Sequence, residues 1–159
     1  MTGCDHETTE KQVTSILVED WDSRKVTIQV SDSLEAGSTY LSSYSQIYVQ
    51  TGRRRFSLTG TISMRNINQS DTVYIDKAKY FKTDGAGIRS YFDEPIYLAP
   101  LETVEIIITE QDIEGGTGDN FVFEWHKPPG THDPFFEGVF ITIYGQQGIS
   151  FTTRGIRID

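Results

Sequence analysis

The sequence predicts an all-β protein built as an antiparallel β-sandwich. Apolar and polar residues alternate with a period of two in several short runs, and turn-forming residues fall between those runs. No helix longer than about ten residues is apparent. About nine or ten short strands at this spacing are typical of an immunoglobulin-like sandwich.

Alternating runs mark the expected strands along the chain. The apolar positions of these runs fall within 26–30, 58–64, 104–108, 121–125 and 139–143. Neighbouring side chains of a strand leave opposite faces, so each run is expected to be half-buried. Between residues 73 and 81 the apolar parity slips at Asp76 and Lys77, which predicts a β-bulge.

Turn chemistry separates these strands. The segment Asp84-Gly85-Ala86-Gly87 suits a hairpin, because Asp and Gly tolerate positive φ. Pro95 and Pro100 bracket a short segment of edge-strand character. Glycines at 115–118 and the turn at 128–130 bound the strand at 121–126. We therefore expect a flexible polar tether over residues 1–12 and a single sandwich domain over 13–159.

Composition excludes several classes of protein. Acids outnumber bases by 23 to 14, and the net charge of −9 argues against a nucleic-acid binder. The single cysteine, Cys4, rules out an intrachain disulfide and a zinc site of several thiolates. No run approaches the ~18 apolar residues of a transmembrane segment.

Charge is distributed unevenly along the chain. Residues 53–89 carry eight bases and three acids, whereas residues 90–137 carry eleven acids and one base. In a folded domain these two blocks either lie together and neutralise each other, or lie apart and create a large dipole.

Four stretches together resemble a known family. They are Ser45-Gln46-Ile47-Tyr48, LTGTISMRN at 58–66, GGTGDNFVFEW at 115–125 and GQQGISF at 145–151. With these motifs the chain resembles the bacterial domain-of-unknown-function family 3124, over roughly residues 38–155. That resemblance implies an exported or lipid-anchored bacterial protein. It implies no activity and transfers no catalytic residue.

The N-terminus indicates a cellular address. Thr2-Gly3-Cys4 is similar to the end of a bacterial lipobox, after which Cys4 is acylated, and residues 6–12 are polar as a tether requires. The prediction is a periplasmic lipoprotein, associated with the membrane through this anchor and not through a transmembrane segment. The alternative is an incidental cysteine in the tail of a cytoplasmic protein.

The acidic loop within residues 110–124 carries the most distinctive local chemistry. Its proposed binding residues are Gly115, Gly116, Gly118, Asp119 and Asn120. The carboxylates of Asp112, Glu114 and Asp119 are the oxygen ligands that calcium would use, and calcium is the one cofactor considered. The alternative is a tight turn in which Asp119 and Asn120 cap their own backbone.

A second polar loop joins the expected strands at 139–144 and 149–153. Gln146 and Gln147, flanked by Gly145 and Gly148, offer both donors and acceptors to a partner. If this loop and the loop at 115–120 lie at one end of the sandwich, they form the first choice for a functional surface.

Other polar groups have both a functional and a structural interpretation. Glu124 and His126 share one strand face, where they form either an acid–base pair or partners for lysines on a neighbouring strand. His126, His132 and Asp133 would be metal ligands only if the turn between them allowed convergence.

Two surface features also have alternative explanations. Arg53-Arg54-Arg55 either contacts anionic lipid headgroups or forms a solvated turn that pairs with acidic strands. Tyr40, Tyr44 and Tyr48 fall on one strand parity and form either an exposed patch or packing within the core.

The leading function is a non-enzymatic extracytoplasmic binding or interaction domain, whose partner is a protein or another envelope component. The alternative is a carbohydrate-active enzyme or a calcium-binding module that uses the acidic loop 110–124. A third reading is a structural subunit of an envelope complex. No nucleophile–base set is legible in the sequence, so no catalytic residue is assigned.

Overall fold

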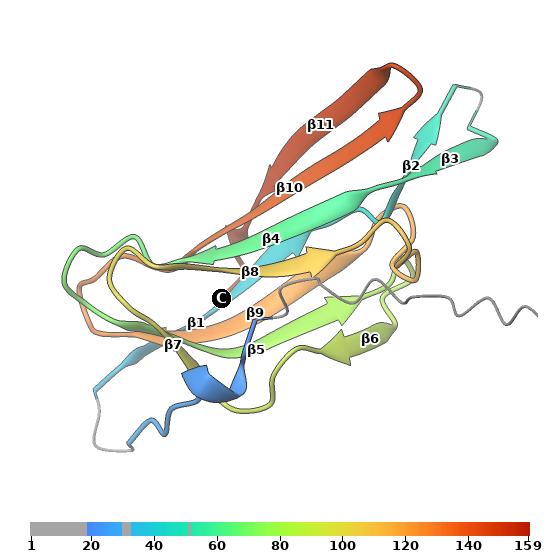
Figure 1. Ribbon diagram of the computed structural model, residues 1–159. Helices are drawn as coiled ribbons and strands as arrows, with labels where there is room; N and C mark the ends of the chain where they lie inside the picture. The colour runs from blue at the N-terminus through green and yellow to red at the C-terminus, as the bar shows by residue number, and fades with distance from the viewer. Residues whose placement is uncertain (1–18, 30–32, 51) are drawn as a thin grey trace, which may run out of the picture.

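Two antiparallel sheets packed face to face form the body of the protein (Figure 1). The computed structural model describes residues 19–29, 33–50 and 52–159. The larger sheet has the order β12-β1-β9-β5-β6, and β7 also pairs with β5. Its strands are β1 (Glu35–Ser42), β5 (Val73–Phe81), β6 (Gly87–Ser90), β7 (Ile96–Leu98), β9 (Asn120–Lys127) and β12 (Ile156–Arg157).

The second sheet has the order β11-β10-β4-β8. Its strands are β4 (Thr59–Arg65), β8 (Thr103–Ile108), β10 (Phe135–Tyr144) and β11 (Gln147–Arg154). A separate hairpin pairs β2 (Gln46–Val49) with β3 (Arg54–Ser57). The all-β sandwich expected from the alternating runs is confirmed, while its immunoglobulin-like character stays a prediction.

Strand β9 organises the core between the two sheets. It pairs with β1 on one side and with β5 on the other, and its inward side chains Phe121, Phe123 and Trp125 are fully buried. The Phe123 ring stacks on Phe136 of β10, with 4.2 Å between ring centroids, and so joins the sheets. Burying such rings is among the largest contributions that single side chains make to stability.

Several local predictions are confirmed by the pairing. The β5–β9 register shifts between Ile75 and Lys77, which is the expected bulge. Residues 82–86 form the turn of the predicted hairpin, in which Gly85 has φ +86°. The segment between Pro95 and Pro100 contains the short strand β7, which pairs with β5 and forms a single bridge with Lys25 through Ile96.

Two expectations about the strands need correction. Twelve strands form within the described residues, more than the nine or ten predicted. Five of them, β2, β3, β6, β7 and β12, are too short to show a clear alternating run in the sequence. The alternation at 26–30 predicted a strand, but residues 26–29 form none. The Val26 amide donates to the Pro95 carbonyl (2.9 Å), and Pro95 has no N–H to return the bond.

The N-terminal predictions concern a part of the chain that the structure leaves undescribed. Cys4 and the expected tether over 1–12 lie outside the described residues. The described part of the chain begins at Glu19 and includes a 3₁₀ helix at Asp22–Arg24. Within it, no helix is long and apolar enough to cross a bilayer.

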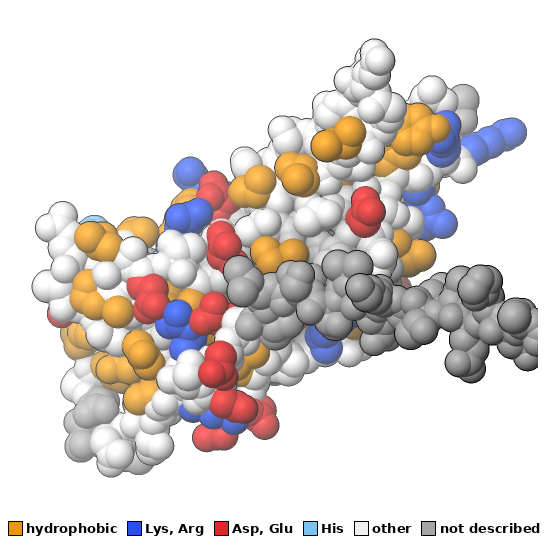
Figure 2. Space-filling model, viewed as in Figure 1, with side chains coloured by type: hydrophobic (Ala, Val, Ile, Leu, Met, Phe, Trp, Pro, Cys, Tyr) orange, Lys and Arg blue, Asp and Glu red, His pale blue; other side chains and the backbone are white. Residues whose placement is uncertain are grey.

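Two hairpins extend past one end of the sandwich (Figure 1). One is the β2–β3 hairpin, and the other is the far half of the β10–β11 hairpin, which ends at Tyr144 and Gln147. Hydrophobic and basic side chains are visible on these hairpins in Figure 2. This end of the molecule therefore presents surfaces that the two sheets do not cover.

Gly37 provides a test of the packing around β9. A Cβ atom at this buried position would lie 2.3 Å from atoms of the Trp125 ring, whereas a Cβ atom at Gly87 would meet nothing within 4 Å. We expect Gly37→Ala to lower the free energy of unfolding by about 1–3 kcal/mol. Gly87→Ala should change it by less than about 0.5 kcal/mol. Urea denaturation measures both, and equal effects would contradict the packing described.

Candidate functional site

Four connecting segments meet at the end from which the hairpins extend (Figure 1). They are the β1–β2 connection at 43–45, the β5–β6 turn at 82–86, the β8–β9 loop at 109–119 and the β2–β3 hairpin. Main-chain hydrogen bonds link them, including Gln46 N–H to the Gly116 carbonyl (2.9 Å) and Thr83 N–H to the Gly115 carbonyl (3.0 Å). The loops are therefore joined into one unit.

Asp119 holds this unit to the sheet. Its side chain is almost fully buried, with 1% exposure. One carboxylate oxygen accepts the Ser43 hydroxyl, and the other accepts the Ser45 main-chain N–H at 2.7 Å. The Ser43 N–H in turn donates to the Asp119 carbonyl (2.8 Å). A buried carboxylate needs such donors to offset its lost hydration.

Tyr80 closes the same network from β5. Its hydroxyl lies 2.7 Å from the Ser45 hydroxyl, and burial raises the pKa of Tyr80 well above its usual value. A Cβ atom at Gly115 would lie 2.1 Å from both the Tyr80 hydroxyl and an Asp119 oxygen. Only glycine fits there, which explains the first glycine of the loop.

Thr83 connects the β5–β6 turn to the glycine loop. Its hydroxyl donates to the Gly115 carbonyl (2.9 Å) and accepts the Gly118 N–H (3.0 Å). Gly116 lies between them with φ +90°, a conformation that disfavours other residues. The predicted tight turn is present. Its Asp119 carboxylate, however, binds the distant β1–β2 connection instead of capping its own backbone, a contact that local spacing could not reveal.

The carboxylates proposed as calcium ligands are engaged by protein groups at two separate places. Arg89 of β6 pairs with Asp112 (2.8 Å) and Glu114 (3.6 Å), while Asp119 faces the two serines. Across the described ranges, no group of three His, Cys, Asp or Glu residues is placed to hold a metal ion.

An open cleft of about 540 Å³ lies beside the pinned loop. Tyr48 and Arg55 of the β2–β3 hairpin line one side, and residues 82–84 and 114–117 line the other. Arg55 and Lys82 form no ion pair with any described residue. The cleft thus offers an exposed aromatic ring, two cations without ion pairs, the carboxylates of Asp84 and Glu114, hydroxyl groups and main-chain groups of a held loop.

Gln146 and Gln147 lie at this same end of the molecule (Figure 1). The functional surface predicted from the sequence required their loop and the loop at 115–120 to share one end. Gln146 lies in the exposed β10–β11 turn, where Gly145 has φ +62°, and Gln147 is the first residue of β11. Neither residue lines the cleft. Asn120, the last residue of the predicted loop, begins β9 and pairs with Ser42 and Phe81.

Glu124 follows the structural alternative. It accepts hydrogen bonds from Lys77 (2.8 Å) and Lys79 (3.3 Å) on β5, and these bonds lower its pKa. His126 instead contacts Asp76, with 2.6 Å between Nδ1 and Oδ2. Burial raises the pKa of Asp76. Glu124 and His126 therefore have separate partners and do not form a pair.

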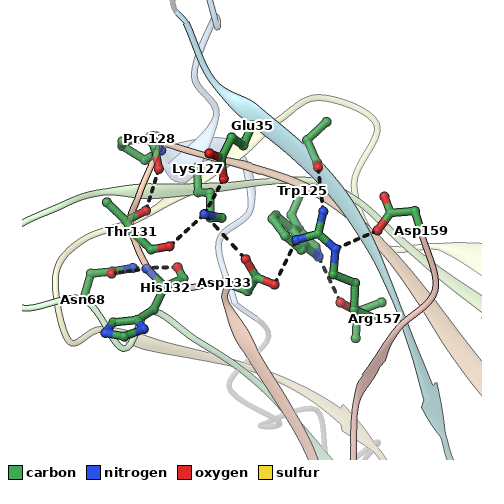
Figure 3. Close-up of polar contacts among 12 residues, drawn as sticks. Glu35, Asn68, Trp125, Lys127, Pro128, Thr131, His132, Asp133, Arg157 and Asp159 are labelled. Atoms are coloured by element: carbon green, nitrogen blue, oxygen red, sulfur yellow. Dashed lines mark hydrogen bonds and ion pairs between the residues drawn. The ribbon is translucent and has the colours of Figure 1, made fainter.

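His132 and Asp133 belong to a polar cluster around β9 (Figure 3). The His132 N–H donates to Asn68 (2.8 Å), whereas Asp133 pairs with Arg157 (3.1 Å) and Lys127 (3.6 Å). Lys127 is only 4% exposed and also pairs with Glu35 at 2.6 Å. The convergence of His126, His132 and Asp133 that a metal site would need does not occur within the described residues.

The three tyrosines grouped by parity separate in the structure. Tyr40 lies in β1, Tyr44 lies in the connection that follows, and Tyr48 lies in β2. Tyr44 packs edge-on against Phe140 and Phe151. Tyr48 is 60% exposed and lines the cleft. The chain bend at 43–45 breaks the parity on which the grouping rested.

Sequence reasoning missed residues that complete the site. Ser43 and Ser45 hold Asp119, Thr83 holds the glycines, and Lys82 contributes a cation. Lys82 and Thr83 directly precede the predicted Asp84–Gly87 hairpin, so their place at a turn was predictable. Their position beside a loop 32 residues away was not.

Comparison with known proteins gives a family match and one weakly similar solved structure. A family model described as "Protein of unknown function (DUF3124)" matches residues 36–158. No curated protein matches the chain. A solved structure, "Crystal Structure of Thermotoga maritima 1070", is similar with a TM-score of 0.48 and 10% identity, covering 76% of this chain and 92% of that chain.

Asp119 provides a test of the loop anchor. Asp119→Ala would leave the buried Ser45 N–H and Ser43 hydroxyl without their acceptor, so we expect a loss of about 2–3 kcal/mol in the free energy of unfolding. Asp84→Ala removes a carboxylate that accepts one exposed N–H, that of Ala86, and should cost less than about 1 kcal/mol. Urea denaturation compares them. Equal losses would show that Asp119 is not an anchor.

Proposed function

We propose, from the premise that the chain belongs to the DUF3124 family of proteins of unknown function, that it is a non-enzymatic binding domain of the bacterial cell envelope. In this proposal the cleft beside the 114–117 loop receives an acidic segment of a protein partner. A lipid on Cys4 holds the domain at the membrane, outside the cytoplasm.

The observation that carries the binding role is that two cations of the cleft, Arg55 and Lys82, form no ion pair, although Asp84 and Glu114 also line it. Most described bases lie against acids, as Lys77 and Lys79 do against Glu124. Arg55 and Lys82 lack such partners although the protein carries a charge of −9. Carboxylates of a partner would supply them, with Tyr48 available for apolar contact.

The held loop explains why this cleft suits recognition. Binding costs less when the receiving surface is ordered beforehand, because fewer groups lose conformational freedom on contact. Gly115 and Gly116 are fixed by Asp119, Tyr80 and Thr83, so their main-chain groups already have one orientation. The loop therefore contributes shape, while Arg55 and Lys82 contribute charge.

The enzyme alternative gains no support from the carboxylates on which it relied. Glycosidic cleavage needs two carboxyl groups about 5–9.5 Å apart on either side of a substrate. Asp119 is buried and accepts hydrogen bonds from Ser43 and Ser45, and Asp112 pairs with Arg89. Neither of these two residues lines the cleft, and Glu114, which does, pairs with Arg89 as well.

Cross-linking inside the source bacterium tests the cleft. A photoreactive amino acid at Thr117, which lines the cleft, should capture a protein partner, and the Arg55→Glu, Lys82→Glu double variant should abolish the adduct by charge repulsion. The matched control places the same group at Leu101, which is 66% exposed and does not line the cleft. Equal adducts at both positions, or an adduct insensitive to charge reversal, would contradict the proposal.

Membrane fractionation tests the lipid anchor. When the protein is expressed from its own gene, it should incorporate labelled fatty acid and sediment with membranes. Cys4→Ser should abolish the label and release protein from the membrane fraction by more than about tenfold, because the acyl chains supply most of the attachment. Wild-type protein without the fatty-acid label would disprove the lipid anchor. That result would not contradict the proposed binding role of the cleft.

A further inference from the structure

The two projecting hairpins are joined at their tips by an aromatic–cation contact. Phe56 of β3 stacks on Tyr144 of β10 with 4.4 Å between ring centroids. The Arg54 guanidinium lies 4.5 Å from the centre of the Tyr144 ring and hydrogen-bonds its hydroxyl. The hairpins therefore act as one structure, here called the hairpin tip, which comprises the described residues of 46–57 together with 141–150.

The hairpin tip exposes apolar side chains on both of its faces. Ile141 (48% exposed) and Ile143 (80% exposed) lie on the outer face of β10. Tyr144 (52%) lies on the opposite face, and so does Ile149 (39%), which pairs with Thr142. A flat protein surface would cover only one of these faces, whereas immersion in a lipid interface would cover both.

Charge around the hairpin tip opposes that of the rest of the protein. The hairpin tip, 46–57 with 141–150, contains three arginines and neither Asp nor Glu. The remaining residues hold all 23 acids and 11 of the 14 bases, which gives them a charge of −12. A positive tip on a strongly negative body would orient the molecule toward an anionic surface.

The arginines of the tip are free to meet such a surface. Within the described part of the chain, the Lys and Arg residues without an ion pair are Arg53, Arg54, Arg55, Lys82 and Arg154. Three of these form the β2–β3 end, beside Tyr144. Basic groups next to aromatic and aliphatic ones are the composition of a membrane-interface segment.

We propose that the hairpin tip docks on an anionic lipid bilayer, with Ile143 and Tyr144 entering the headgroup region and Arg53 and Arg55 contacting lipid phosphates. Apolar burial and charge attraction act together here, since each is weak alone. This inference goes beyond the proposed binding function. It uses Ile143 and Arg53, which do not line the cleft, and it does not require acylation of Cys4.

The test uses the full chain with Cys4→Ser, which removes both the lipid anchor and the only cysteine. Co-sedimentation is measured with vesicles of phosphatidylcholine alone and of equimolar phosphatidylcholine and phosphatidylglycerol. Binding should require the anionic lipid and weaken as salt rises. Ile143→Ser should weaken it about tenfold, and Arg53→Gln about fivefold.

Matched controls separate the tip from the general surface. Ile67 is 45% exposed just after β4, at the end of that strand where β10 begins, so Ile67→Ser should leave binding unchanged. Arg154→Gln removes another arginine that has no ion pair. Arg154 lies opposite Glu137 in the β10–β11 register, away from the hairpin tip, so this change should also leave binding unchanged. An environment-sensitive dye on Ile143→Cys should report an apolar medium with anionic vesicles, whereas one on Ile67→Cys should not.

Three outcomes would overturn the proposal. One is the absence of binding to anionic vesicles, and a second is binding that the Ile143→Ser and Arg53→Gln changes leave intact. The third is self-association that depends on Ile143, seen by sedimentation equilibrium without vesicle binding, which would assign the tip to contact with a second copy. The changed side chains are exposed, so each variant should fold. Circular dichroism checks the folding of each one.

Discussion

The buried Asp119 carboxylate is the interaction on which the functional end of the molecule depends. It directly precedes β9, the strand around which the core is packed, and accepts hydrogen bonds from the connection after β1. Because β9 is fixed between β1 and β5 by its buried aromatic face, the position of Asp119 is fixed as well. The packing of the core therefore also stabilises the conformation of the β8–β9 loop. Without Asp119, few contacts would hold that loop in place.

Charge pairing on the sheet surface explains why the remaining cations are informative. The basic block 53–89 and the acidic block 90–137 partly neutralise each other, as Lys77 and Lys79 do with Glu124, and Arg89 does with Asp112. Most of the cations that this pairing leaves without an acidic partner lie at one end of the molecule, in the cleft and on the hairpin tip. Exposed pairs add little stability, so their main consequence here is a polarised surface potential.

The two proposed surfaces are compatible in one orientation of the molecule. Arg55 lies between them, because it lines the cleft and belongs to the β2–β3 hairpin. A tip resting on anionic lipid would bring the cleft close to the membrane, where a lipid on Cys4 would also hold the chain. A partner whose acidic segment lies near the membrane surface would then meet the cleft with less loss of orientational freedom.

The sequence by itself determined the β-sandwich, the bulge at Asp76, the hairpin at 84–87 and the presence of a glycine turn at 115–118, because strand alternation and positive φ are local properties. It placed Gly116 and Asp119 in the right loop, and it placed Glu124 beside lysines as one of two interpretations. Only the tertiary structure decided that Asp119 binds Ser43 and Ser45, that Lys82 meets Arg55 across a cleft and that Phe56 stacks on Tyr144. Each of these contacts joins residues far apart in the chain, and such pairings follow from how the sheets stack and twist, which no local spacing encodes.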